Sequence, residues 1–184
     1  KNGFASIHGQ TVKTSSFGVT DQSYDLTFDI LKGKFPKYKI ENNSFNKKGR
    51  VEGELVGGNL ALIYALLGTN YSFNFKDKIL FIEDIGENFY ALDRMLMSLD
   101  LAGVFRKIKG LIVGGMTNMG DEKDNKNFGE SFDEFAYKII SERISKYDFP
   151  TIFGFPNGHI HDNRPLLIGG TVKMEVEEKV KVEF

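Results

Sequence analysis

Two short, continuously apolar runs place the strongest limit on how this chain can fold. Lys78–Ile82 and Gly110–Val113 are flanked by charged residues or glycines, and neither alternates between apolar and polar positions. Such strands are buried on both faces, which is typical of parallel strands covered by helices. Between the two runs, Leu92, Leu96 and Leu99 fall on one face of an expected helix. The order strand, helix, strand therefore predicts that part of the sheet is parallel.

Other segments alternate apolar and polar residues, as strands with one solvent-exposed face do. These segments are Phe35–Glu41, Arg50–Val56, Thr171–Val176 and Lys179–Phe184. Pro36 marks the first as an edge strand, and Gly57-Gly58 is expected to break the second. The last two are expected to form a C-terminal hairpin. With about seven or eight strands and four helices in all, we expect an α/β fold of sheet and helix layers with a mixed sheet.

Capping residues indicate where several helices begin. Asp21 and Asn59 each precede a helical pattern, and the alternative at Asn59 is an anion held by its own amide group and those of the two preceding glycines. Ser131-Phe-Asp-Glu134 is a capping box for a helix that should bury Phe135. The polar segment Asn118–Gly129 is expected to be a surface loop, with a lid over the site as the alternative.

Length and charge exclude several classes of protein. At 184 residues the chain suits one domain, and its net charge of −1 gives no global basic field for nucleic acid and no polybasic membrane anchor. The absence of cysteine excludes thiol catalysis, disulfides and thiolate metal sites. No apolar run approaches the ~20 residues that span a bilayer, and no signal peptide is visible, so we expect a cytoplasmic protein. The first residue is Lys1, so we expect residues 1–20 to be a linker remnant and residues 21–184 to be the folded domain.

A carboxylate follows the first buried run directly. Glu83 comes after four apolar residues, and in parallel α/β sheets the carboxyl ends of strands face the ligand crevice. A carboxylate at this place can hold an imidazole in one tautomer, although a salt bridge or a helix-start carboxylate explains the pattern equally well. Asp84 and Glu87 lie nearer to the next helix and fit the structural role better.

Two of the three histidines lie on one turn-rich loop. His159 follows Asn157-Gly158, a pair that lets the backbone bend sharply and expose the next side chain, so His159 is a candidate general base. A purely structural loop histidine is the alternative. His161 has less turn support, and His8 lies in a weakly patterned segment and receives little weight.

Neither a nucleophile nor a complete metal site stands out in the sequence. None of the ten serines has glycines at positions −2 and +2, the pattern of a strained nucleophile turn. His159, His161 and Glu83 could instead ligate zinc or another divalent ion, but no further residue clearly completes such a site. We therefore expect no cofactor and no metal, and we keep the metal-dependent hydrolase as an alternative.

Several ordered blocks of the sequence resemble the C-terminal part of the LD-carboxypeptidase family, serine peptidases that include the microcin C self-immunity hydrolases. The blocks are Gly53–Leu60, Leu67–Thr69, Ile79–Glu87, Asp93–Leu96, Leu101–Gly103, Gly158-His159 with Asn163, and Leu166–Gly169. Any one block is weak, but their order and spacing together are highly specific. Asn70 departs from the family pattern, which usually has proline after Gly-Thr.

The resemblance implies particular roles for two residues. By motif position the family's catalytic glutamate falls on Glu83 and its catalytic histidine on His159. It also implies a swivelling β/β/α layered fold and an N-terminal domain, absent here, that bears the serine and the oxyanion hole. The expected function is thus half of a Ser-Glu-His triad that cleaves an amide bond next to a C-terminal D-amino acid in murein peptides, inactive without the serine domain.

The resemblance also bears on partners and on what remains open. The expected partners are the missing N-terminal domain, a murein tetrapeptide or related peptide and, as a possibility, a second copy of the chain, with no nucleic acid and no membrane. The alternatives are the metal-dependent hydrolase and a non-catalytic module for dimerisation or ligand binding.

Overall fold

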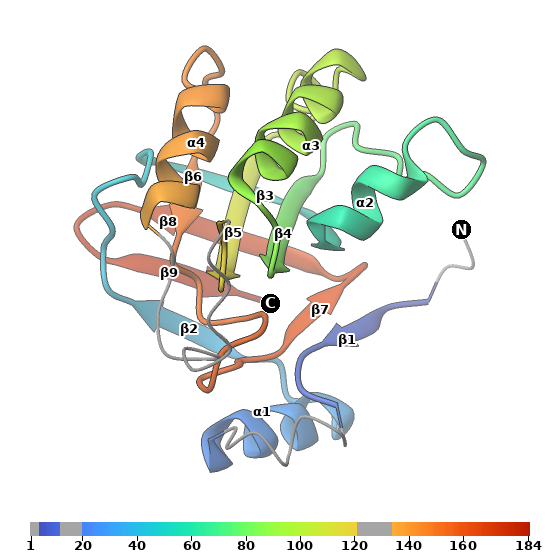
Figure 1. Ribbon diagram of the computed structural model, residues 1–184. Coiled ribbons are helices and arrows are strands. Elements are labelled where there is room, and N and C mark those ends of the chain that lie inside the picture. Colours follow the sequence, from blue (N-terminus) through green and yellow to red (C-terminus); the bar gives the residue numbers. More distant parts are fainter. Residues whose placement is uncertain (1–3, 12–19, 121–133) are drawn as a thin grey trace.

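A computed structural model describes residues 4–11, 20–120 and 134–184, in which the chain forms nine strands and four helices (Figure 1). The helices are α1 (Asp21–Leu31), α2 (Leu60–Leu66), α3 (Phe89–Leu101) and α4 (Glu134–Ile144). The strands are β1 (Ser6–His8), β2 (Lys37–Ile40), β3 (Gly49–Asn59), β4 (Ile79–Ile85), β5 (Gly110–Thr117), β6 (Thr151–Phe153), β7 (Leu166–Ile168), β8 (Thr171–Val176) and β9 (Val180–Glu183).

Seven strands form one mixed sheet in the order β2-β9-β8-β3-β4-β5-β6. The long strand β3 joins its two parts, because its first half pairs antiparallel with β8 and its second half pairs parallel with β4. β4, β5 and β6 continue the parallel part, whereas β9 and β2 continue the antiparallel part. The other two strands, β1 and β7, form a separate antiparallel pair.

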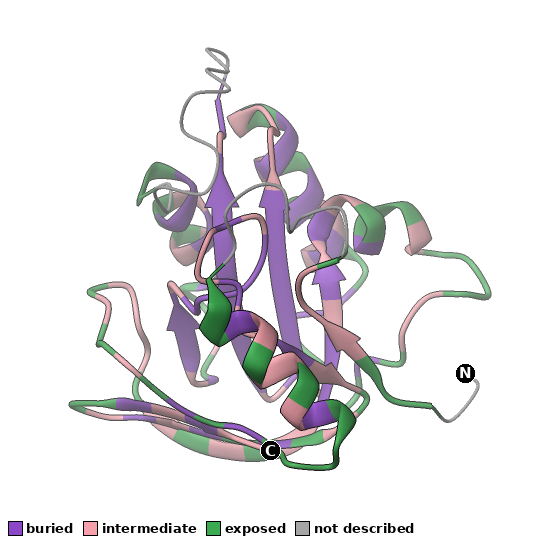
Figure 2. Ribbon diagram, turned by 90° about the horizontal axis from the view of Figure 1, so that it is seen from below, coloured by how far each residue is buried: buried purple, intermediate pink, exposed green. Residues whose placement is uncertain are grey.

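The parallel strands lie between two hydrophobic cores. Alternate side chains of β4 explain this, since Leu80 and Ile82 contact the helix side while Ile79 and Phe81 contact the other side. On the helix side, α2, α3 and α4 cover the sheet (Figure 1). On the other side, the antiparallel strands β8 and β9 pack back against the parallel ones. The result is the expected β/β/α layering with a mixed sheet, and Figure 2 shows the parallel strands buried over most of their length.

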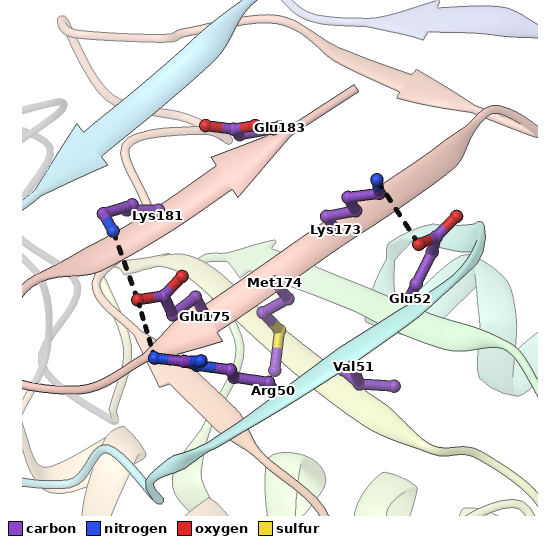
Figure 3. A pocket seen from close by; sticks show the side chains of 8 residues that line it. All are labelled: Arg50, Val51, Glu52, Lys173, Met174, Glu175, Lys181 and Glu183. Atoms are coloured by element: carbon purple, nitrogen blue, oxygen red, sulfur yellow. Dashed lines mark hydrogen bonds and ion pairs between the residues drawn. The ribbon is translucent and has the colours of Figure 1, made fainter.

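The outer face of the antiparallel part is a charged, solvent-exposed surface. A shallow hollow there is lined by Arg50, Val51, Glu52, Lys173, Met174, Glu175, Lys181 and Glu183 (Figure 3). The charges pair across the strands, with Lys173 Nζ 3.6 Å from Glu52 and Lys181 Nζ 3.1 Å from Glu175. Exposed ion pairs of this kind keep the sheet face hydrated and contribute little to the stability of the fold. This hollow is therefore a feature of the sheet surface and not of the candidate site.

Several local predictions are confirmed and three are wrong. The edge strand, the C-terminal hairpin and the Asn59 cap are present, the last with Asn59 Oδ1 accepting from the Leu62 amide at 3.1 Å. The cap of α1, however, is Thr20 and not Asp21. Phe135 is 52% exposed and not buried, because α4 turns other side chains inward, Tyr137 and Ile140 among them.

The third correction concerns the glycine pair, which does not break its strand. β3 runs through Gly57-Gly58 to Asn59, with φ of 134° and 142° at the glycines. A Cβ on Gly57 would lie 1.9 Å from the Phe81 carbonyl oxygen, so glycine is needed for β3 to approach β4 this closely.

Two further segments bear on the sequence predictions. Most of the polar segment Asn118–Gly129 and of the capping box at Ser131 lies outside the described residues. Within the described ranges, no helix is long and apolar enough to cross a bilayer.

Candidate active site

The structure brings Glu83 and His159 together. Glu83 lies near the carboxyl end of β4, and His159 lies on the loop after β6. His159 Nδ1 is 2.9 Å from Glu83 Oε2. The Glu83 side chain is 2% exposed, whereas that of His159 is 39% exposed. The Glu83 carboxylate is thus buried, whereas the His159 imidazole reaches the surface, where a reacting group could contact it.

Gly158 makes this close approach possible. Its φ is 118°, and a Cβ on it would lie 2.9 Å from Glu83 Oε2, which is closer than such atoms approach one another. The Gly158 amide donates to Asn163 Oδ1 at 3.2 Å. Thr117, at the end of β5, donates its hydroxyl to the His159 carbonyl oxygen at 3.3 Å. The loop that presents His159 is therefore fixed from both sides.

Asn157 is the main internal brace of the same loop. Its Nδ2 donates to the carbonyl oxygens of Arg164 at 2.7 Å and of His8 at 3.0 Å, and its own carbonyl oxygen accepts from the Gly115 amide at 2.9 Å. Asn157 is fully buried. It ties β1, the end of β5 and the histidine loop into one unit.

Asp84, the neighbouring carboxylate, holds structure on the helix side of the sheet. Its oxygens accept from Asn59 Nδ2 at 2.8 Å, from the Ile85 amide at 2.9 Å and from the Ala61 amide at 3.0 Å. Burial raises the pKa of Asp84, and these three hydrogen bonds oppose the rise. The side chain thus has a structural role, as expected, but it anchors the start of α2 and not the start of α3 (Phe89–Leu101), the helix that follows it in sequence.

The surroundings of His159 raise its proton affinity. The hydrogen bond to Glu83 raises the pKa of His159, burial lowers it, and the negative charges of Glu83 and Asp84 raise it further. The net effect is a pKa above the ordinary histidine value of about 6.5. A carboxylate that binds Nδ1 also leaves Nε2 as the nitrogen that exchanges a proton with a substrate or nucleophile.

His8, which received little weight from the sequence, lies on the other side of Glu83. Its Nε2 is 3.7 Å from Glu83 Oε1. The ring packs edge-on against Phe81, with centroids 5.2 Å apart. β1, which carries His8, has only three residues, and the opening segment has no periodicity that would reveal it. Its pairing with β7, in which it lies opposite Leu166, places it here.

The geometry gives no support to the metal alternative. His161 contributes its carbonyl oxygen to hydrogen bonds from the amides of Thr20 and Asn163. Over the part of the chain that the structure describes, no group of three or more His, Cys, Asp or Glu side chains is arranged to hold a metal ion.

Sequence comparison identifies relatives of this chain. Residues 52–174 match the family model of the LD-carboxypeptidase C-terminal domain. The probable murein peptide carboxypeptidase of Bacillus subtilis is 34% identical over 134 residues, which are 73% of this chain and 40% of that protein. The microcin C7 self-immunity protein MccF of Escherichia coli is 27% identical over 78% of this chain and 40% of its own length.

A solved structure extends the similarity to the whole described fold. The muramoyltetrapeptide carboxypeptidase from Oxalobacter formigenes superposes with a TM-score of 0.84 and 26% identity, over 100% of this chain and 62% of that one. The chain thus spans about half the length of these relatives. Because the family model matches most of the sequence, the chain belongs to the LD-carboxypeptidase family.

Proposed function

We propose that this chain supplies the glutamate and histidine of a Ser-Glu-His triad in a carboxypeptidase that cleaves the amide bond before a C-terminal D-amino acid in murein peptides. The single observation that carries the proposal is the 2.9 Å contact between the buried Glu83 carboxylate and the half-exposed His159 ring. The names of the relatives, a murein peptide carboxypeptidase among them, support the choice of substrate.

In the proposed reaction His159 moves one proton in each direction. Its Nε2 takes the proton of a serine hydroxyl as the serine oxygen bonds to the scissile carbonyl carbon, and it then gives that proton to the leaving amine as the C–N bond breaks. A water molecule repeats the sequence to release the acyl group. Glu83 holds the Nδ1–H tautomer and stabilises the imidazolium that forms between the two transfers.

The serine and the oxyanion hole are assigned to a second domain, of the kind the family pairs with this one. Several serines of this chain are already hydrogen-bonded within or next to helices. The hydroxyls of Ser98 and Ser145 donate to the carbonyl oxygens of Arg94 and Glu142, and Ser23 Oγ is 3.0 Å from Thr20 Oγ1. The two-domain protein is this chain together with the proposed serine-bearing domain.

We expect the 184-residue chain alone to release no D-amino acid from an L,D-linked tetrapeptide, while the two-domain protein turns it over. Without the serine, the imidazole has no nucleophile to activate. The measurement is D-alanine release, followed by chromatography, at equal protein concentrations. Turnover by the chain alone at the rate of the two-domain protein would show that the nucleophile lies within these residues.

Gly158→Ala in the two-domain protein should lower kcat by roughly 100-fold, because a methyl group 2.9 Å from Glu83 Oε2 must push the carboxylate or the loop away. Gly33→Ala is the matched control. Its φ of 80° is also positive, but nothing lies within 4 Å of an added Cβ, so it tests backbone strain without a clash. We expect Gly33→Ala to cost some stability and to leave kcat unchanged. Equal kcat in both variants would mean that the spacing of Glu83 and His159 does not matter for turnover.

A further inference from the structure

The two oxygens of the Glu83 carboxylate face different imidazoles. Oε2 lies 2.9 Å from His159 Nδ1, and Oε1 lies 3.7 Å from His8 Nε2. The proposed triad uses only the first contact. A carboxylate with 2% exposure has almost no water to solvate its second oxygen, so the group beside that oxygen affects how firmly the carboxylate is held.

His8 is held rigidly in this position by contacts on each side. In the β1–β7 pair His8 lies opposite Leu166, and its carbonyl oxygen accepts from Asn157 Nδ2 at 3.0 Å. Its ring lies edge-on against Phe81, and a Cβ on Gly58 would lie 3.6 Å from His8 Nδ1. The loop of His159 and the strand of His8 therefore share one brace, Asn157. Figure 1 shows β1 and β7 side by side, near the carboxyl ends of β4 and β5.

The two imidazoles do not have the same protonation behaviour. Burial lowers the pKa of His8, the charge of Glu83 opposes this, and His159 lowers it further. His159 in turn responds to Glu83 and Asp84, which raise its pKa. The surroundings of the two rings thus favour the neutral form of His8 and the charged form of His159.

We propose that His8 is a positioning residue for Glu83: its ring directs Nε2–H toward Oε1, keeps water away from the carboxylate, and so keeps Oε2 on His159. At 3.7 Å the contact is longer than a hydrogen bond, so the effect comes from the N–H dipole and from the exclusion of water. The inference rests on the proposed function, because it assigns His8 a part in the same catalytic pair.

The test combines two substitutions with two measurements. His8→Ala opens the space beside Oε1 to water, whereas His8→Gln keeps an N–H group at the place of Nε2. In the 184-residue chain, NMR titration of the histidine rings gives the pKa of His159, with resonances assigned from the single-histidine variants. In the two-domain protein, kcat on the L,D-linked tetrapeptide gives the catalytic effect.

We expect His8→Ala to lower the pKa of His159 toward about 6.5, because a hydrated carboxylate attracts the imidazolium less strongly, and to lower kcat by roughly 10- to 100-fold. His8→Gln should restore most of the His159 pKa and most of kcat. If His8→Ala does not fold, His8→Leu, which keeps the apolar bulk and loses the N–H group, takes its place.

Two outcomes would overturn the inference. One is an unchanged His159 pKa and an unchanged kcat in His8→Ala. The other is an equal loss of kcat in the Ala and Gln variants with no movement of the His159 titration, which is what a packing role alone would produce. Glu83→Gln in the same assay separates this from failure of the proposed function. If that variant retains full kcat, the triad is wrong, while the titration of His159 in His8→Ala still tests the positioning of Glu83.

Discussion

Replacing His159 with alanine in the two-domain protein is expected to lower kcat by roughly 10⁴- to 10⁶-fold, with little change in KM. The imidazole is the only group on this side of the site that is both hydrogen-bonded to the buried carboxylate and exposed enough to reach a serine, as far as the described residues show. Its loss removes both proton transfers at once. The measurement is steady-state kinetics on an L,D-linked tetrapeptide, with the fold checked by circular dichroism.

His161→Ala is the matched control for this prediction. His161 lies two residues along the same loop, and the proposed triad assigns it no proton transfer. Its carbonyl oxygen, which the substitution keeps, accepts from the amides of Thr20 and Asn163, so we expect its replacement to leave kcat within a few-fold of the unmodified protein. A metal site built on both histidines would instead lose activity in both variants. His159→Ala also leaves a buried carboxylate without its closest partner, which should cost about 1–3 kcal/mol of unfolding free energy. Full activity of His159→Ala would favour a non-catalytic module.

Much of the fold follows from local sequence patterns, because those patterns report on burial. The continuous apolar runs became β4 and β5, buried on both faces, and the alternating C-terminal segments became the hairpin of β8 and β9. The prediction that Gly57-Gly58 breaks its strand is wrong for a physical reason. Gly57 is needed because the backbones of β3 and β4 approach closely there: a Cβ on Gly57 would lie 1.9 Å from the Phe81 carbonyl oxygen. The local sequence does not reveal this contact, because Phe81 belongs to the neighbouring strand.

The candidate site could be predicted only in part. Strand alternation places Glu83 on the face of Phe81 and Asp84 on the face of Ile82, but it does not say which face holds the helices. The family resemblance implies that Glu83 is the catalytic carboxylate. In the structure, Asp84 instead accepts hydrogen bonds from Asn59 and Ala61 at the start of α2. His8 could not be found this way, since its position depends on a three-residue strand that pairs with a segment at the other end of the chain.

Glu83→Gln is expected to lower the plateau value of kcat by roughly 10³- to 10⁴-fold in the two-domain protein. The amide is nearly isosteric, so the packing around Gly158 is kept. It carries no charge to stabilise the imidazolium, however, and its NH₂ group can donate to Nδ1 and hold the wrong tautomer. Glu54→Gln is the control. Glu54 lies on the neighbouring strand β3 and its carboxylate pairs with Lys78, so its replacement should leave kcat unchanged.

The pH dependence gives this prediction a second readout whose sign is fixed by the structure. Because Glu83 raises the pKa of His159 in the folded state, the pair stabilises the fold fully below about pH 6.5, and this stabilisation is lost as the pH rises through the raised pKa. Catalysis needs the neutral ring, so kcat/KM should rise through that same raised pKa. In Glu83→Gln the main cause of the rise is gone, so the acid limb of the profile should move to lower pH even as the plateau falls. An acid limb that stays in place would mean that Glu83 does not set the proton affinity of His159, and that the 2.9 Å contact has no part in the chemistry.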